Sequence, residues 1–183
     1  TLNRMKFVTP EFEFPHDGVH IRRNDPPLEK ERRLREFKLP AAQAWVRANQ
    51  LDHVILPSAK PRVGLIVTGQ AARDVFEALE AIGLTPDQAS KLGITIYKVA
   101  MPWPLEPEGI RAFCAGLERV LVIEHKRPLI EDQLRAALYT LPEKKRPMIE
   151  GKRTIEGKPL LSQIGSIPVP EMAFRAYQKK FAA

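Results

Sequence analysis

The chain has 183 residues, of which 44% are hydrophobic and 28% charged, the balance of an ordinary soluble globular protein. No apolar run approaches the roughly 20 residues of a membrane-spanning helix, and the opening Thr-Leu-Asn-Arg-Met is no signal peptide, so the sequence favours a cytoplasmic protein over a membrane protein. A single cysteine, Cys114, excludes an internal disulfide, and a start without Met suggests excision from a longer protein.

The net charge of +7 raises the question of nucleic-acid binding. Residues 1–61 carry 11 basic against 8 acidic side chains, residues 62–139 carry 9 against 10, and residues 140–183 carry 9 against 4. The largest excess therefore lies near the C-terminus, around residues 144–146 and 152–153, where no aromatic side chains are interleaved. We interpret these charges as a solvated face or a contact with the rest of a parent protein rather than a nucleic-acid patch, whose binding would weaken steeply with salt.

Residues 1–61 are rich in proline and are predicted to form an interdomain arm. The first 25 residues are expected to be extended, with short strand candidates at residues 7–8 and 18–21. Residues 28–37 indicate a charged helix, and Pro40, at a helix N1 position, begins a second helix that reaches residue 48.

Residues 62–183 are predicted to form an α/β domain, because strands and helices alternate with short connections. The apolar run at 62–69 is typical of a strand buried on both faces of a parallel sheet. The other predicted strands are residues 94–99, 119–124 and 147–149. The predicted helices begin at residue 71, after the N-cap Thr85, at Pro107, at Pro128, and at residue 170, the last carrying Phe174, Tyr177 and Phe181. The expected fold class is a three-layer, Rossmann-like, mostly parallel sheet with helices on both faces.

Ligands of doubly wound sheets bind beyond the carboxyl ends of the strands, so the strand exits are the first places to search for a site. The first exit, residues 67–72, lacks the glycines of a dinucleotide fingerprint and the Lys-Ser/Thr of a P-loop. The second exit, residues 100–108, holds three prolines around Trp103, with Glu106 and Glu108 near a helix start. Since acids in a first helical turn are stabilised by the macrodipole, these two need no catalytic role, and we predict that Trp103, Glu106 and Glu108 belong to an interface.

The third exit places His125, Lys126 and Arg127 beside a helix start. Three potentially cationic side chains at that position predict a site for an anion such as a phosphate, although a solvated surface is the alternative. The other histidines, His16, His20 and His53, have no spacing that suits a metal, and Cys114 lies on the apolar stripe of its helix. The sequence therefore predicts neither a metal ligand set nor a catalytic residue.

Four stretches of the chain resemble the indolepyruvate ferredoxin oxidoreductases in their fused bacterial form. The second exit contributes Met-Pro-Trp-Pro-Leu-Glu-Pro-Glu-Gly at residues 101–109, and the third contributes Glu-His-Lys-Arg-Pro-Leu-Ile-Glu-Asp-Gln-Leu at residues 124–134. The others are Lys-Leu-Pro-Ala-Ala-Gln-Ala with Arg-Ala-Asn-Gln-Leu-Asp within residues 38–52, and Leu-Gly-Ile-Thr-Ile-Tyr-Lys-Val at residues 92–99.

The resemblance implies that residues 62–183 are the domain similar to the C-terminal domain of transketolase in a thiamine-diphosphate-dependent 2-oxoacid oxidoreductase. Such a parent converts aryl pyruvates with coenzyme A to an aryl-acetyl-coenzyme A and carbon dioxide, and passes electrons through iron–sulfur clusters to ferredoxin. It implies thiamine diphosphate and magnesium in other domains of a homo-oligomeric parent, with His125, Lys126 and Arg127 as the candidate contact to coenzyme A. This chain has no Gly-Asp-Gly with a downstream Asn-Asn and no cysteine set for a cluster, so by itself it is expected to be an inactive accessory domain.

A second hypothesis belongs to a different class of protein. The same sheet end, with its basic flanks, would suit a free-standing Rossmann-like module that binds a nucleotide or another anionic ligand. An accessory domain would fold without turnover, whereas a free-standing module would bind its ligand in isolation.

Overall fold

The computed structural model describes residues 6–20 and 22–169. They divide into two compact units, one up to Leu51 and one from Asp52. The sequence placed this boundary ten residues later, after residue 61. The boundary lies earlier because residues 53–56, predicted to belong to the arm, form a strand of the sheet.

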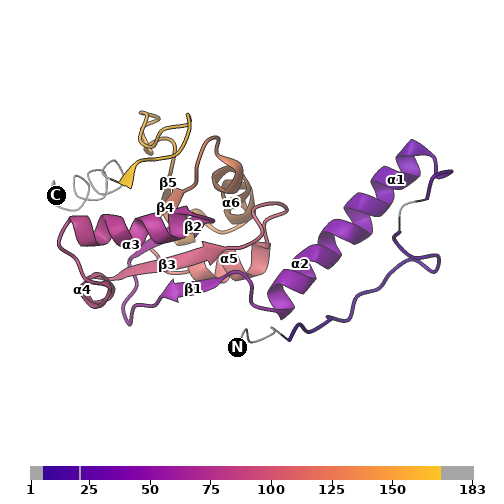
Figure 1. Ribbon diagram of the computed structural model, residues 1–183, viewed down its shortest axis with the longest axis horizontal. Helices are drawn as coiled ribbons and strands as arrows, with labels where there is room; N and C mark the ends of the chain where they lie inside the picture. The colour runs from indigo at the N-terminus through magenta and orange to yellow at the C-terminus, as the bar shows by residue number, and fades with distance from the viewer. Residues whose placement is uncertain (1–5, 21, 170–183) are drawn as a thin grey trace. The chain divides into compact units, whose positions relative to one another are not determined.

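The first unit consists of an extended segment followed by helix. Helix α1 (Pro27–Arg33) continues through a π-helical turn (Leu34–Lys38) into α2 (Leu39–Ala48), so the two predicted helices are confirmed but joined (Figure 1). The predicted strand at residues 7–8 is wrong, since the backbone N–H and C=O of Val8 bond to the side chain of Asn49 instead of to a partner strand. Residues 18–20 are likewise not a strand, and residue 21 lies outside the described residues.

Arg33 connects the extended segment of this unit to its helix. Its guanidinium donates to the carboxylate of Asp17 and to the carbonyl of Gly18, and it lies 3.0 Å from a carboxylate oxygen of Glu29. Only 6% of Arg33 is exposed, although several apolar side chains of this unit are largely open to solvent. Polar contacts therefore hold the extended segment more than an apolar core does.

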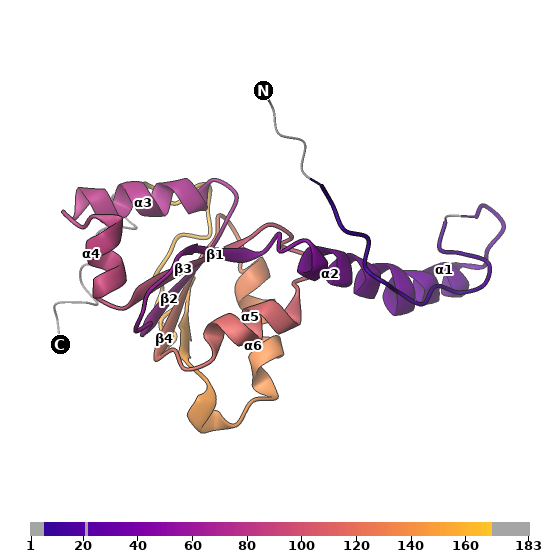
Figure 2. The same cartoon turned by 90° about the horizontal axis from the view of Figure 1, so that it is seen from below.

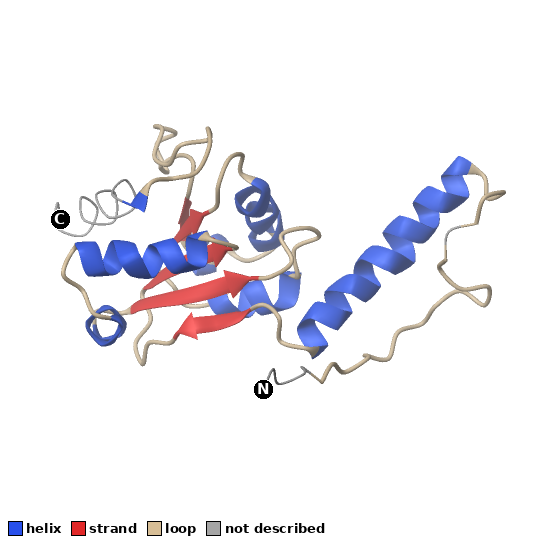
Figure 3. Ribbon diagram, in the orientation of Figure 1, coloured by secondary structure: helices blue, strands red, loops and turns tan. Residues whose placement is uncertain are grey.

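The second unit contains a five-stranded sheet in the order β1-β3-β2-β4-β5 (Figure 3). Strand β2 is parallel to β3 and to β4, β4 is parallel to β5, and β1 is an antiparallel edge strand next to β3. The run at residues 62–69 becomes the central strand, which explains its continuous apolar character. The strands are β1 (His53–Leu56), β2 (Val63–Thr68), β3 (Ile94–Val99), β4 (Arg119–Ile123) and β5 (Met148–Glu150).

Helices cover both faces of this sheet, which confirms the predicted α/β class (Figure 2). Side chains of α3 (Ala71–Ala81) and α4 (Pro86–Lys91) enter one apolar core, and those of α5 (Pro107–Cys114) and α6 (Leu129–Tyr139) enter the other. A 3-10 turn (Glu143–Lys145) leads into β5. The predicted starts of α3, α4, α5 and α6 are confirmed within a residue, among them a complete capping box at Thr85. Pro40 does not start a helix, because the helical chain runs through it from the π-helical turn.

Segments after β5 complete the first core, because Leu160, Leu161 and Ile167 are buried in it. The predicted closing helix from residue 170 lies outside the described residues. Within residues 6–20 and 22–169, no helix has the length and apolar character needed to cross a membrane.

Candidate functional site

The connections of the sheet diverge at the carboxyl ends of β2 and β4. The chain leaves β2 through α3 and α4 on one face to reach β3, and then returns through α5 on the other face to β4. This divergence is the switch point where doubly wound folds bind their ligands. The crevice between these two strand ends is therefore the first candidate site.

His125, from the β4 exit, and Asp74, from α3, approach each other across this crevice. The His125 Nε2 atom lies 3.7 Å from an Asp74 carboxylate oxygen, and the backbone N–H of Ile167 donates to His125 Nδ1 at 3.1 Å. Because Nδ1 accepts this bond, the neutral ring carries its proton on Nε2, toward Asp74. Residues 160–169, which we call the strap, are thus attached to the strand exit that the sequence assigned to an anion.

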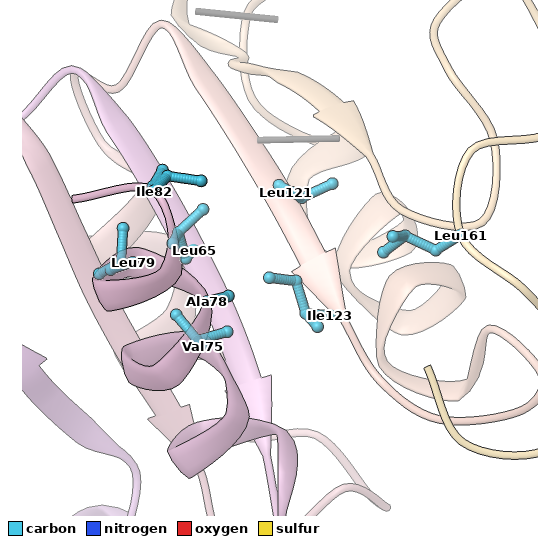
Figure 4. A pocket seen from close by; sticks show the side chains of 8 residues that line it. All are labelled: Leu65, Val75, Ala78, Leu79, Ile82, Leu121, Ile123 and Leu161. Carbon is cyan, nitrogen blue, oxygen red and sulfur yellow. The ribbon is translucent and has the colours of Figure 1, made fainter. Parts of the chain in front are cut away.

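Beneath the strap, aliphatic side chains leave almost no space. Figure 4 shows the side chains that line the gap between α3, strands β2 and β4, and the strap. The volume of this gap is only about 30 Å³. A gap of that size has room for about one water molecule, and its apolar lining offers no partner for one. The lining residues are Leu65, Val75, Ala78, Leu79, Ile82, Leu121, Ile123 and Leu161.

At the third strand exit, a carboxylate of the chain itself occupies the helix start. Glu124, only 4% exposed, accepts hydrogen bonds from the backbone N–H groups of Leu129, Ile130 and Glu131 at 2.8 to 3.1 Å. These amides at the start of α6 are the donors that an external phosphate would use. Burial raises the pKa of the Glu124 carboxyl, and the amides and the ammonium of Lys152 oppose that rise.

Lys152 joins this carboxylate to the strap. Its ammonium donates to the backbone carbonyls of Glu124 and Ser162, and its backbone N–H donates to Glu131 at 2.8 Å. Lys152 is only 3% exposed, and the charge of its ammonium lowers the pKa of the buried Glu124 carboxyl, against the effect of burial. Lys152, which the sequence assigned to a basic surface, is thus a buried structural group.

The three residues predicted to contact an anion at this exit lie in different environments. His125 is partly buried and accepts a bond from the strap, whereas Lys126 and Arg127 are exposed. Lys126 has a positive φ of 61°, which directs the chain through a sharp turn before α6. The helix start that motivated the anion hypothesis is filled by Glu124, so only the two exposed cations remain for such a ligand.

The second strand exit forms a loop that is fixed at both ends. The carboxylate of Asp52 accepts from the backbone N–H of Ala100 at 2.7 Å and of Met101 at 3.3 Å. At the other end, Gln133 accepts from Leu105 N–H at 2.9 Å and donates to the carbonyl of Pro102 at 2.8 Å. Neither Asp52 nor Gln133 was singled out from the sequence, because their role depends on contacts across 28 to 49 residues.

This fixed loop presents one aromatic side chain to solvent. Trp103, which precedes a cis peptide bond to Pro104, is 55% exposed, and Glu108 is also exposed. Glu106, by contrast, is only 2% exposed and accepts from the backbone N–H groups of Glu108 and Gly109 as the N-cap of α5. Its assignment to an interface needs correction, because the helix amides hold its carboxylate inside.

A group of ionisable side chains lies under the loop. Burial raises the pKa of Asp52, and the nearby Glu106 adds to that rise. Burial also raises the pKa of Tyr97, and the charges of Asp52 and Glu106 act in the same direction. One carboxylate oxygen of Asp52 is buried without a hydrogen-bond partner among the described residues. The arrangement secures the loop, and Cys114 is no nucleophile for it, since burial raises the pKa of this thiol to about 12.

The cofactors expected for the parent do not fit the residues of this chain. A cluster needs several thiolates and the sequence has one cysteine, and no group of three His, Cys, Asp or Glu residues in the described part could hold a metal ion. The starts of α5 and α6 are occupied by Glu106 and Glu124, so neither offers its amides to a diphosphate. The unit is a doubly wound α/β domain in which Glu106 and Glu124 occupy the helix starts at two of the strand exits.

The sequence profile of the indolepyruvate oxidoreductase domain matches residues 53–175, and the chain therefore belongs to that family. Its relatives include indolepyruvate oxidoreductase subunit IorA of Methanothermobacter thermautotrophicus, 25% identical over 57% of this chain and 15% of the relative. The same subunit of Thermococcus kodakarensis is 27% identical over 73% of this chain and 18% of the relative. The matched region thus spans less than a fifth of either relative.

Two solved structures share parts of the chain path. The match to a split-gene transketolase, described as an inactive beta4 tetramer, covers 69% of this chain and 40% of the transketolase chain, with a TM-score of 0.45 and 13% identity. The match to the 2-oxoglutarate:ferredoxin oxidoreductase of Magnetococcus marinus covers 95% of this chain and 27% of the oxidoreductase chain, with a TM-score of 0.44 and 17% identity.

Proposed function

We propose that this chain is an accessory, interface-forming domain of an indolepyruvate:ferredoxin oxidoreductase. The observation that carries this proposal is the second strand exit, where Asp52 and Gln133 fix a loop that presents Trp103 without any catalytic group beside it. A rigid loop loses little conformational entropy on binding, and tryptophan is one of the side chains enriched at the energetic centre of interfaces. Family membership supports the same reading.

In this proposal the chemistry belongs to other domains of the parent enzyme. Those domains bind thiamine diphosphate, magnesium and the iron–sulfur clusters, and they convert aryl pyruvates and coenzyme A while electrons pass to ferredoxin. The present chain contributes the loop at residues 101–108 and the exposed part of residues 124–128, with Trp103 and Glu108 as interface contacts. We further propose a cytoplasmic, homo-oligomeric parent, in which Lys126 and Arg127, with His125 behind them, face coenzyme A or another anion.

A free-standing module that binds a nucleotide at the switch point remains the alternative function. The strap weighs against it, because Ile167 contacts His125 where a nucleotide would lie and the gap below is only about 30 Å³. Ligand pockets for small molecules usually have at least roughly 300 Å³. An opening of the strap would therefore have to precede any nucleotide binding at this edge.

The proposal is tested in the whole oxidoreductase that contains this chain, with Trp103→Ala and a control, Leu92→Ala. Both side chains are exposed, at 55% and 48%, but Leu92 precedes β3 and therefore lies at the opposite end of that strand from the loop. We expect Trp103→Ala to weaken domain association and to lower indolepyruvate-dependent ferredoxin reduction about tenfold or more, while Leu92→Ala leaves both unchanged. Equal activity of the two variants would contradict the docking role, and nucleotide binding by the isolated chain would favour the alternative.

A further inference from the structure

A second hollow lies along the outer edge of β5, apart from the strand exits. It has a volume of about 250 Å³ and lies between the second half of α6 and the segment that leads into β5. Leu138 and Pro147 are buried and Ile149 is half-buried, so they form an apolar floor. Arg135, Tyr139 and Arg146 complete the lining and are exposed.

The two guanidinium groups are held in place by backbone carbonyls. Arg146 donates to the carbonyls of Leu141 and Tyr139, and its guanidinium carbon lies 5.1 Å from the centre of the Tyr139 ring. Arg135 donates through Nη2 to Glu131 at 2.8 Å and to the carbonyl of Ile149 at 3.0 Å. The Nη1 groups of both arginines make no hydrogen bond to the described part of the chain.

The charge around the hollow is positive. Glu131 pairs with Arg135 but also accepts from the buried backbone of Lys152, so its charge is shared. Lys144 and Lys145, immediately before Arg146, add two exposed cations against the single exposed Glu143. An anion is therefore attracted to this edge, and the Nη1 group of each guanidinium can donate to one oxygen of a carboxylate.

We propose that this hollow binds a small aromatic carboxylate, with the carboxylate on Arg135 and Arg146 and the ring over the apolar floor beside Tyr139. The volume lies below the roughly 300 Å³ at which sites for drug-sized ligands begin, which restricts the ligand to about one or two rings. The hollow shares no lining residue with the loop at residues 101–108, which we call the docking loop, so this inference does not depend on the proposed function.

The test measures the binding of phenylacetate, the probe, to the 183-residue chain by isothermal titration calorimetry and saturation-transfer NMR. We expect saturable binding of phenylacetate, with 2-phenylethanol and 2-phenylethylamine, which share the ring but lack the anion, at least about tenfold weaker. Arg146→Gln should reduce affinity about tenfold or more, and Tyr139→Ala should reduce it without any change of charge. The matched control is Lys144→Gln with Lys145→Gln, which removes two charges outside the lining and should reduce affinity less than about threefold.

Four results would overturn the inference. No saturable binding at millimolar phenylacetate, or equal binding of 2-phenylethanol, would remove the carboxylate site. Inorganic phosphate that binds as tightly as phenylacetate and displaces it would show a plain oxyanion patch without a place for the ring. An equal loss in the double lysine variant would show diffuse attraction instead of a site. Far-UV circular dichroism of each variant separates loss of binding from loss of fold.

Discussion

The carboxylate of Glu124 accepts the backbone N–H of Ile130 with both oxygens, at 2.8 and 3.1 Å, and thereby places the end of β4 on the start of α6. Replacement of Glu124 by glutamine keeps the shape but turns one acceptor into a donor that opposes these amides. We expect Glu124→Gln to lower the unfolding free energy by about 1 to 3 kcal/mol, measured by urea denaturation at neutral pH. The control Glu143→Gln, an exposed acid of the 3-10 turn, should change it by less than about 0.5 kcal/mol. A Glu124→Gln variant as stable as the parent would show that the amides do not need the charge.

Asp52 gives the second unit a pH dependence whose sign follows from its raised pKa. In the native state Asp52 holds its proton to a higher pH than the ordinary value of 3.8, so between these two pH values the native state binds more protons than the unfolded state. The contribution of Asp52 to the unfolding free energy therefore falls as the pH rises through this window. We expect Asp52→Asn to gain stability relative to the parent between about pH 3 and about pH 7, in urea titrations at several pH values. A constant difference across that range would contradict the raised pKa.

Gly151 is required by the packing of Glu131. A Cβ atom at this position would overlap the Glu131 carboxylate and lie 3.2 Å from the carbonyl oxygen of Val122. We expect Gly151→Ala to destabilise the chain by about 1 to 3 kcal/mol, since Glu131 cannot move without losing its bond to Lys152. Gly157→Ala is the control, because its Cβ would meet nothing within 4 Å and only its φ of 80° costs about 1 kcal/mol. Equal thermal unfolding midpoints for the two variants would argue against the clash.

Gln133 is predicted to keep the docking loop rigid. Its side-chain oxygen accepts from the Leu105 N–H at 2.9 Å, and its side-chain NH2 donates to the carbonyls of Pro102 and Leu129 at 2.8 Å. We expect Gln133→Ala to speed hydrogen exchange of the Leu105 amide at least about tenfold while exchange of the central strand β2 stays unchanged. Exchange measured by mass spectrometry on peptides of both regions separates the two. If the Leu105 amide keeps its protection, some other contact holds the loop.

Cys114 should be inert in the folded chain. With a pKa of about 12 and a side chain at 0% exposure, only about one thiol in ten thousand is ionised near pH 8. We expect iodoacetamide to modify Cys114 at least about a thousandfold more slowly in buffer than in urea, followed by the mass of the intact chain. Comparable rates in both conditions would mean that α5 opens readily or that the thiol is not buried.

Local sequence patterns predicted most of the secondary structure of the second unit. The apolar run at the central strand β2, the β-branched alternation of β3 and the N-cap at Thr85 each depend on neighbours a few residues away, so the sequence predicted those elements within a residue or two. The sequence did not predict the edge strand β1, because its four residues, next to a proline-rich segment, show little alternation of apolar and polar side chains. Strand β1 is defined instead by its pairing with β3. Trp103 was also identified correctly as an exposed residue of an unusual loop.

The sequence by itself determined the order of strands and helices from β2 to β5, the family and the single cysteine that is too few for a cluster, since these depend on composition and on local motifs. Only the tertiary structure decided which charged side chains are available to a ligand. Glu106 and Lys152 look like surface residues in one dimension, yet each is buried where helix amides, backbone carbonyls or an opposite charge satisfy it. A charge is stable inside a protein only when partners from distant segments surround it, and such partners become visible only after the chain has folded.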